Sequence, residues 1–294
     1  MEIGVQLPEV ERQVAWPEMR EIALAAESVG LDSIWLGDHL LYRDEMGPRG
    51  PMETWSLLAA LGEATERVAL GPLVAATSFH APGMLAKKAA TVDEISGGRL
   101  ILGLGAGWNE TEYRAFGFPY DHRVARFAEA LTIIAALVRE GAADFDGRFY
   151  RHEELELFPR PRRDMKIMVG SNGPRMLAIA APHVDMWNSW FVDFHNDSMR
   201  AAQLVAEVDA RFVAAGREPG EVEKSVAVYV QLGEGGSRRG SDGEAPIRGT
   251  RDDIARQLAS FHGVVDHLQV VLDPIDRGGI EELGEIVGLA RRLS

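Results

Sequence analysis

The sequence predicts an α/β protein that forms a single domain over residues 1–294, a (β/α)8 TIM barrel with inserted loops on the C-terminal face of its strands. Two observations carry this prediction. Short apolar runs alternate with longer segments of helical periodicity along the whole chain. Eight such pairs fit into the 294 residues. Alternation predicts a parallel sheet, and eight units of this length favour a closed barrel over an open sheet.

The predicted strands share a short apolar run that ends in small or polar residues. In chain order they span residues 3–7, 33–36, 68–75, 100–104, 166–169, 184–188, 225–232 and 267–272. The predicted helices share apolar residues at helical spacing. In chain order they span residues 17–29, 54–65, 82–95, 122–139, 174–181, 198–215, 252–261 and 280–293.

Capping residues support several of these boundaries. Gly30 is expected to end the first helix in a left-handed conformation, and Thr54 is expected to be an N-cap. Pro82 is expected in the first turn of its helix. The segment 145–150 predicts a hairpin turn between the fourth and fifth units. Residues 233–249 form a predicted loop of 17 residues with six glycines, a length typical of a mobile lid or a disordered excursion.

Composition excludes several classes of protein. The net charge of −14 argues against nucleic-acid and anionic-membrane partners, because phosphates bind to basic surfaces. The chain has no cysteine, which excludes disulfides and thiolate chemistry. We expect no signal peptide, because the N-terminus lacks a basic region and a long apolar core, and no transmembrane segment. A soluble, cytoplasmic protein is therefore predicted, and the net charge leaves a small-molecule site open.

Active sites of such barrels lie at the C-terminal ends of the strands, so we expect the candidate residues there. The second strand leads to Asp38 and His39. Histidine exchanges protons near neutral pH, and an adjacent carboxylate orients it or raises its pKa. The alternative is a pair at the start of a helix whose side chains bind backbone groups. Their position at a strand end favours a catalytic His39 tuned by Asp38.

The glycines after the fourth strand allow two interpretations. The run from Gly103 to Gly107 has the spacing G-x-G-x-G, a weak match to a dinucleotide-binding loop, and no amphipathic helix is expected directly after it. Small residues here would let a flat ring approach the backbone, with Asn109 offering a donor and an acceptor. Tight packing against a neighbouring strand is the alternative.

A third strand end is a candidate phosphate site. The amides of Ser171, Asn172 and Gly173 precede a helix that opens with Pro174, and Arg175 could add a charged contact. A simple N-cap turn is the alternative. P-loop, H-E-x-x-H and G-x-S-x-G motifs are absent from the sequence, and no metal site is predicted.

These residues together resemble the bacterial luciferase-like monooxygenase superfamily, and most closely its oxidoreductases that depend on coenzyme F420. The resemblance runs almost the whole length and is carried by the segments 34–39, 67–71, 82–100, 102–110 and 249–254. It implies a (β/α)8 barrel, a homodimer, and a deazaflavin or flavin ring over the strand ends. It also implies a non-proline cis peptide at Leu73–Val74. The residues expected to contact the cofactor are Asp38, Leu73, Val74, Thr77, Gly105, Ala106, Gly107, Asn109, Gly170, Ser171, Asn172, Gly173 and Arg175.

The leading hypothesis is hydride transfer between F420 and a small organic substrate, with His39 as general acid or base. Ala106 stands where F420-dependent sugar-phosphate dehydrogenases of this family carry a glutamate. F420 has an acidic tail, and Arg160, Arg162, Arg163 and Arg175 are the basic residues near the predicted phosphate turn. Two alternatives remain open at this point, namely a monooxygenase using reduced FMN and O2, and a non-catalytic flavin-binding protein.

Overall fold

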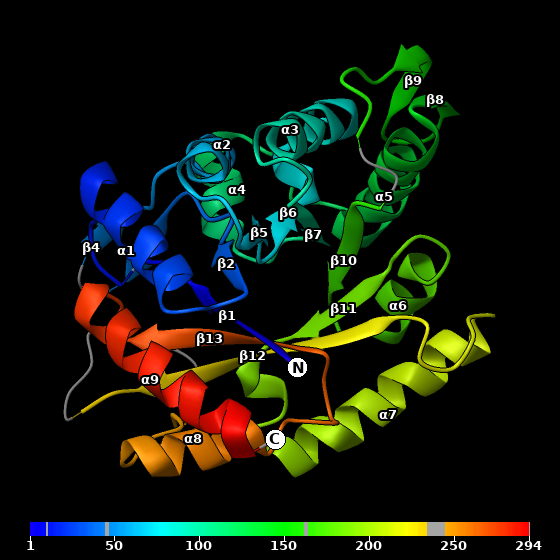
Figure 1. Ribbon diagram of the computed structural model, residues 1–294. Coiled ribbons are helices and arrows are strands. Elements are labelled where there is room, and N and C mark those ends of the chain that lie inside the picture. Colours follow the sequence, from blue (N-terminus) through cyan, green and yellow to red (C-terminus); the bar gives the residue numbers. More distant parts are fainter. Residues whose placement is uncertain (10, 45–46, 162–163, 234–244, 294) are drawn as a thin grey trace.

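Figure 1 shows the computed structural model, which describes residues 1–9, 11–44, 47–161, 164–233 and 245–293. Within these ranges, nine strand segments form one parallel sheet, whose neighbouring pairs all run in the same direction. In order across the sheet they are β5 (Ala69–Pro72), β2 (Ser33–Leu36), β1 (Glu2–Gln6), β13 (His267–Asp273), β12 (Glu223–Gln231), β11 (Met186–Ser189), β10 (Lys166–Gly170), β7 (Ile101–Gly105) and β6 (Ala75–Ala76).

The sheet nearly closes into a barrel where β5 meets β7. A parallel bridge joins Leu70 to Leu100, and Leu70 N donates to Arg99 O over 3.1 Å. Because β5 pairs with β2 and β6 pairs with β7, these two segments are halves of one strand. Counting them once gives the eight positions of a (β/α)8 barrel, so the predicted fold class is confirmed.

The third strand differs from its prediction. The prediction of one uninterrupted strand over 68–75 is wrong. The segment pairs with β2 as far as Pro72, and it pairs with β7 only from Ala75 onward. Between the two halves, the Leu73–Val74 peptide bond is cis, as the family resemblance implies.

Apolar side chains fill both the inside of the barrel and the layer around it. Trp35, Ile101, Met168 and Met186 are buried together inside the barrel. Successive strand residues point to opposite faces, so the residues beside them pack outward against the helices. The surrounding helices are α1 (Trp16–Ser28), α2 (Thr54–Ala64), α3 (Pro82–Ile95), α5 (Arg123–Glu140), α6 (Pro174–Ala180), α7 (Ser198–Ala214), α8 (Arg251–Ala259) and α9 (Arg277–Leu293).

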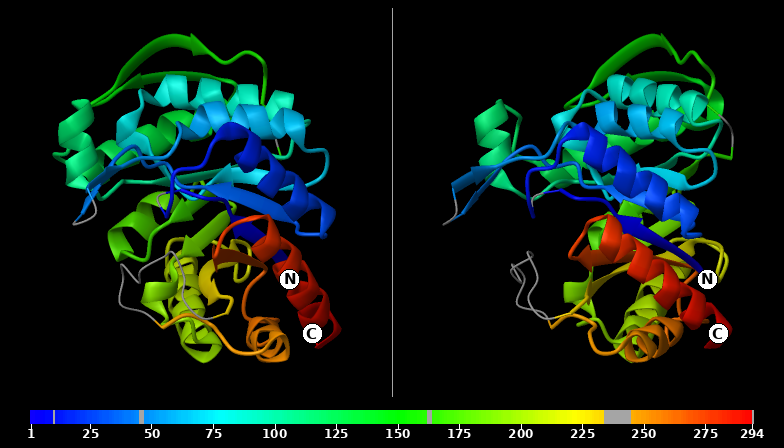
Figure 2. Two further views of the ribbon diagram at one scale, coloured as in Figure 1. Left: turned by 90° about the vertical axis from the view of Figure 1, so that its left-hand side faces the viewer. Right: turned by 60° about the vertical axis from the view of Figure 1, so that its left-hand side comes forward.

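Two hairpins and a short helix interrupt the strand–helix alternation. The hairpins are β3 (Tyr42–Asp44) with β4 (Gly47–Arg49), and β8 (Ala142–Asp146) with β9 (Arg151–Glu156). The second confirms the predicted turn at 145–150. The expectation that no helix directly follows Asn109 is wrong, because the Asn109 side chain caps α4 (Glu110–Phe116) by accepting from Thr111 N at 3.2 Å. Figure 2 shows α4 and the β3–β4 hairpin projecting together from one side of the barrel.

Two of the three expected capping roles are confirmed. Pro82 opens α3, and Gly30 follows α1 with a φ of 86°. Thr54 is not the N-cap of α2, because its hydroxyl donates to Gly37 O at 2.6 Å. The Glu53 side chain caps that helix instead.

The predicted loop at 233–249 lies mostly outside the described residues, which end at 233 and resume at 245. In the described part, Ile247 forms a bridge to Val230. Two short 3-10 helices, η1 (Thr77–Phe79) and η2 (Phe191–Asp193), follow β6 and β11. Among the helices described, none has the length and apolar character that a membrane crossing requires.

The near closure of the barrel predicts a steric requirement at Gly71. A Cβ there would lie 2.1 Å from the Ile101 carbonyl oxygen, so Gly71→Ala should destabilise the fold by about 1–3 kcal/mol. Gly288 in α9 is the matched control, since its nearest neighbour would be 3.7 Å from a Cβ, and Gly288→Ala should stabilise by about 0.5–1 kcal/mol. Urea unfolding of both variants measures the two changes. A Gly71→Ala protein as stable as the parent would contradict the close β5–β7 packing.

Candidate active site

The end of the barrel where the strands terminate brings the ends of the second, third and fourth predicted strands together. Asp38 follows β2, and its Oδ2 accepts from Ala76 N in β6 at 3.0 Å. Asn109 follows β7, and its Nδ2 donates to Leu41 O at 3.3 Å. Side chains at these ends are therefore tied to the backbone of their neighbours, as expected for a site built from several strands.

His39 is held by a carboxylate that sequence analysis did not identify. Its Nδ1 lies 3.0 Å from Oε2 and 3.2 Å from Oε1 of Glu112, a side chain of α4 that is only 1% exposed. An ionised carboxylate only accepts hydrogen bonds, so Nδ1 donates to Glu112. The Nε2 atom is then the atom of His39 that remains to exchange a proton with a substrate.

A second carboxylate lies near this Nε2 atom. Glu9 Oε1 is 3.9 Å from His39 Nε2, and Glu9 Oε2 accepts from Gln6 Nε2 at 2.9 Å. Gly37 provides the space for it, because a Cβ at Gly37 would lie 2.0 Å from Glu9 Oε1. The chain after β1 therefore contributes a carboxylate to a histidine that follows β2.

These two carboxylates decide the protonation of His39. Burial by itself lowers the pKa of His39, but the charges of Glu9, Glu112 and Asp38 and the hydrogen bond to Glu112 outweigh burial and raise the pKa above 6.5. Burial raises the pKa of Glu112, but the hydrogen bond and charge of His39 and the backbone amides outweigh it and lower the pKa below 4.5. Between pH 4.5 and pH 6.5, the imidazole of His39 and the carboxylate of Glu112 are therefore both charged.

Asp38 holds the neighbouring strand rather than His39 itself. It is buried, and its Oδ2 binds His80 Nε2 at 3.2 Å in addition to Ala76 N. Asp38 therefore fixes the end of β6 and the segment that follows. Its charge is one of those that raise the pKa of His39, so a tuning role stays a prediction.

The glycines of β7 and β10 make room for Val74. A Cβ on Gly105 would lie 2.7 Å from Val74 Cγ2, and a Cβ on Gly170 would lie 3.0 Å from both Val74 methyl carbons. A Cβ on Gly103 would lie 2.2 Å from the Pro72 carbonyl oxygen. Gly103 and Gly105 therefore fit the second interpretation of the glycine run, which is tight packing against a neighbouring strand. Leu73 and Val74 themselves remain partly exposed at this end of the barrel.

Three residues near β7 are expected to contact a cofactor but bind the protein itself. The Asn109 side chain uses its acceptor on Thr111 N and its donor on Leu41 O. Thr77 is fully buried and donates to Gly105 O at 3.2 Å. Gly107 has a φ of 74°, and the Tyr113 hydroxyl lies where its Cβ would be. Ala106 is partly exposed, and its carbonyl accepts from that hydroxyl at 2.9 Å.

The predicted phosphate turn is tied to the adjacent strand. Asn172 Nδ2 donates to Ser189 Oγ at 2.8 Å, and Trp187 Nε1 donates to Ser171 O at 2.9 Å. The Oδ1 atom of Asn172 is buried without a hydrogen-bond partner among the described residues. Gly173 and Arg175 are exposed.

The other arginines expected near this turn do not support it. Arg160 Nη1 donates to Glu140 O at the C-terminal end of α5, which faces the opposite end of the barrel. Arg162 and Arg163 lie outside the described residues. Arg175 is therefore the described arginine that adjoins the turn.

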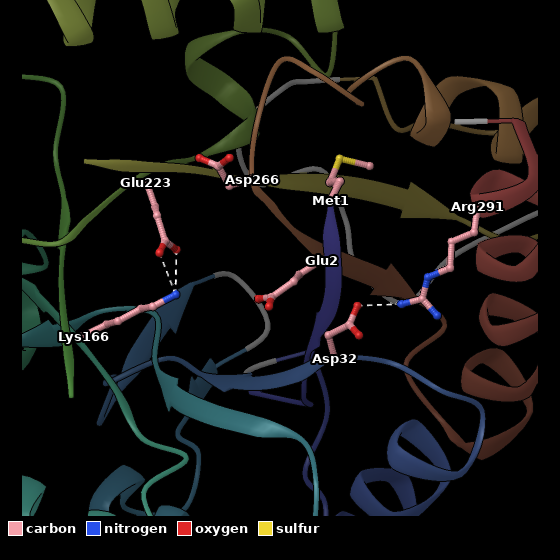
Figure 3. Close-up of a pocket in the computed structure, with 7 residues that line it drawn as sticks. All are labelled: Met1, Glu2, Asp32, Lys166, Glu223, Asp266 and Arg291. Carbon is pink, nitrogen blue, oxygen red and sulfur yellow. Dashed lines mark hydrogen bonds and ion pairs between the residues drawn. The ribbon is translucent and has the colours of Figure 1, made fainter. Parts of the chain in front are cut away.

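A hollow of about 530 Å³ lies at the other end of the barrel, where the strands begin (Figure 3). Four of its charged side chains form two ion pairs with one another. Lys166 Nζ binds Glu223 at 2.7 Å, and Arg291 Nη2 binds Asp32 at 2.6 Å. In barrels of this type, the N-terminal face of the strands contributes to stability rather than to catalysis. We therefore place the active site at the His39 end.

A parallel barrel with a histidine–carboxylate pair at the C-terminal ends of its strands has the architecture of a TIM-barrel enzyme. Residues 1–285 match the family model described as luciferase-like monooxygenase, and the chain belongs to this family. The family resemblance seen in the sequence is thereby confirmed.

Individual relatives include F420-dependent enzymes and monooxygenases. The chain is 29% identical to an F420-dependent glucose-6-phosphate dehydrogenase of Intrasporangium calvum, over 72% of this chain and 64% of that protein. It thus spans less than two thirds of that relative. An F420-dependent secondary alcohol dehydrogenase in complex with an F420–acetone adduct has a similar fold, with a TM-score of 0.80, 18% identity and 99% of both chains covered. The EDTA monooxygenase of Chelativorans sp. BNC1 superposes with a TM-score of 0.82 and 16% identity, covering 99% of this chain and 94% of that one.

The His39–Glu112 pair predicts a specific change in protonation. Glu112→Gln keeps an acceptor for the backbone but removes the charge, so the pKa of His39 should fall. Glu110→Gln, an exposed change on the same helix, should leave it unchanged. Histidine titration by NMR measures this pKa, and equal values in both variants would contradict the pairing.

Proposed function

We propose that this protein is an F420-dependent oxidoreductase that transfers a hydride between the deazaflavin and a small organic substrate. The observation that carries the proposal is the His39–Glu112 pair, which orients an imidazole of raised pKa at the end of the barrel where Leu73 and Val74 are partly exposed. The similarity to an F420-dependent dehydrogenase supports the choice of cofactor. The proposal includes a homodimer, which rests on the family resemblance. It also includes a single catalytic domain, supported by the strand–helix alternation along the whole chain, and a cytoplasmic location, supported by the lack of cysteine.

The residues at this end fit a deazaflavin. Leu73, Val74 and Ala106 offer partly exposed apolar surface to a flat ring. The buried Oδ1 of Asn172 has no partner among the described residues, and it would accept from a hydroxyl of the side chain that links the ring to its phosphate. The turn from Gly170 to Gly173, with Arg175, would hold the phosphate. When bound, F420 supplies a two-electron hydride donor or acceptor.

The protein contributes orientation and a proton. Glu112 accepts from Nδ1 and fixes the ring of His39, which leaves Nε2 to give a proton to a carbonyl oxygen or take one from a hydroxyl. Because the pKa of His39 is raised, the imidazole is charged up to a higher pH and is suited to donate. Asp38 holds β6 in place beside this site.

The experiment is a titration of the cofactor-free protein with oxidised F420 and, separately, with FMN, followed by ligand fluorescence. We expect tighter binding of F420 than of FMN. Preference for FMN would support the monooxygenase alternative, and binding of neither would overturn the cofactor assignment.

The same titration on His39→Gln separates binding from catalysis. We expect this variant to bind F420 as the parent does, while kcat falls by about 100- to 10,000-fold because general acid–base catalysis is lost. His262→Gln, an exposed histidine between α8 and β13, is the matched control and should change neither quantity. Unchanged turnover in His39→Gln would remove this residue from the mechanism, and F420 binding without any turnover in the parent would support a non-catalytic binding protein.

A further inference from the structure

Trp108 is a large apolar side chain exposed beside the proposed proton donor. Its side chain is 63% exposed, although it directly follows the buried strand β7 and its short glycine-rich loop. Its ring centroid lies 5.6 Å from that of His39 in an edge-to-face arrangement. Single exposed apolar residues are common on proteins, so exposure by itself does not indicate a site.

The backbone around Trp108 is nevertheless firmly held. Arg123 Nη1 donates to Gly107 O at 2.9 Å, and the Tyr120 hydroxyl donates to Trp108 O at 3.3 Å. The Asn109 side chain ties the next residue to Leu41 O. Since this segment is fixed on both sides, the fold presents the indole outward in a defined position.

A second ring completes the arrangement. Tyr42 of the β3–β4 hairpin lies 4.7 Å from His39 and 6.3 Å from Trp108, measured between ring centroids. The hairpin and α4 project together from the barrel (Figure 2). Trp108 directly precedes Asn109, the N-cap of α4, so the two aromatic residues come from neighbouring segments. His39 therefore adjoins two aromatic rings that can pack against a flat apolar group.

The charges around His39 disfavour an anionic substrate. Glu9 and Glu112 both lie within 4.0 Å of the imidazole ring nitrogens, and Asp38 adds a third carboxylate that acts on the same ring. The guanidinium of Arg123 is already engaged by the protein, because it binds Gly107 O and lies 4.1 Å from the Tyr120 ring centroid. Carboxylates outnumber the imidazolium here, so an added negative charge would be repelled.

We propose that this site takes an uncharged substrate in which a flat apolar group adjoins the reacting carbonyl or secondary hydroxyl, and that Trp108 and Tyr42 select it. This inference rests on the proposed function. In the reducing direction, bound reduced F420 would supply the hydride to the carbonyl carbon and would itself become oxidised F420. The carbonyl oxygen gains the proton from His39 Nε2, and the product is the secondary alcohol.

The test uses acetophenone and its anionic analogue 4-acetylbenzoate as probes of the F420-loaded protein. We expect calorimetry to show tighter binding of acetophenone. Trp108→Leu keeps an apolar side chain but removes the ring, so it should weaken acetophenone binding and raise KM by about tenfold, with kcat and F420 affinity little changed. Phe158→Leu is the matched control, because Phe158 is 55% exposed and its ring lies by Arg160, away from His39.

The outcomes separate this inference from the proposed function. Equal or tighter binding of 4-acetylbenzoate, or unchanged acetophenone binding in Trp108→Leu, would overturn the inference while leaving F420 dependence intact. If F420 does not bind, the proposed function fails, and NMR of the His39 ring during acetophenone titration of the cofactor-free protein still decides the aromatic site. A shift of the His39 signals in the parent that is lost in Trp108→Leu would support it, and no shift would overturn it.

Discussion

The arrangement at the His39 end of the barrel depends on the buried carboxylate of Glu112. It accepts from His39 Nδ1 and from the amides of Leu40 and Leu41, at 2.6 Å and 3.0 Å respectively. A buried carboxylate must be paired and hydrogen-bonded, so these contacts dock α4 onto the segment after β2. The same contacts fix the orientation of the His39 ring, which joins the packing of an inserted helix to the chemistry of the site.

This pairing also links stability to pH. The pKa of His39 is raised above 6.5, so its contribution to stability is complete below pH 6.5 and is lost as the pH rises through the higher folded value. The pKa of Glu112 is lowered below 4.5, so its contribution is complete above pH 4.5 and is lost as the pH falls through the lower folded value. Docking of α4 is therefore strongest between these limits, where the pair holds both charges.

Much of the barrel could be predicted because each strand–helix unit has its own local pattern, and the strand ends then locate Asp38 and His39. Glu9 and Glu112 could not be found in this way. Each reaches His39 across the fold, and Glu112 lies in a helix of seven residues with no motif of its own. The sequence predicts that the Asn109 side chain faces a ligand. In the structure this side chain instead binds the backbone, accepting from Thr111 N in α4 and donating to Leu41 O just before β3.

We propose that the deazaflavin ring binds at the His39 end of the barrel. An experimental structure of the protein with F420 bound tests it most directly. We predict the ring against Leu73 and Val74, with a reacting group within hydrogen-bond reach of His39 Nε2. A ring bound elsewhere, for example in the charged hollow where the strands begin, would contradict the claim.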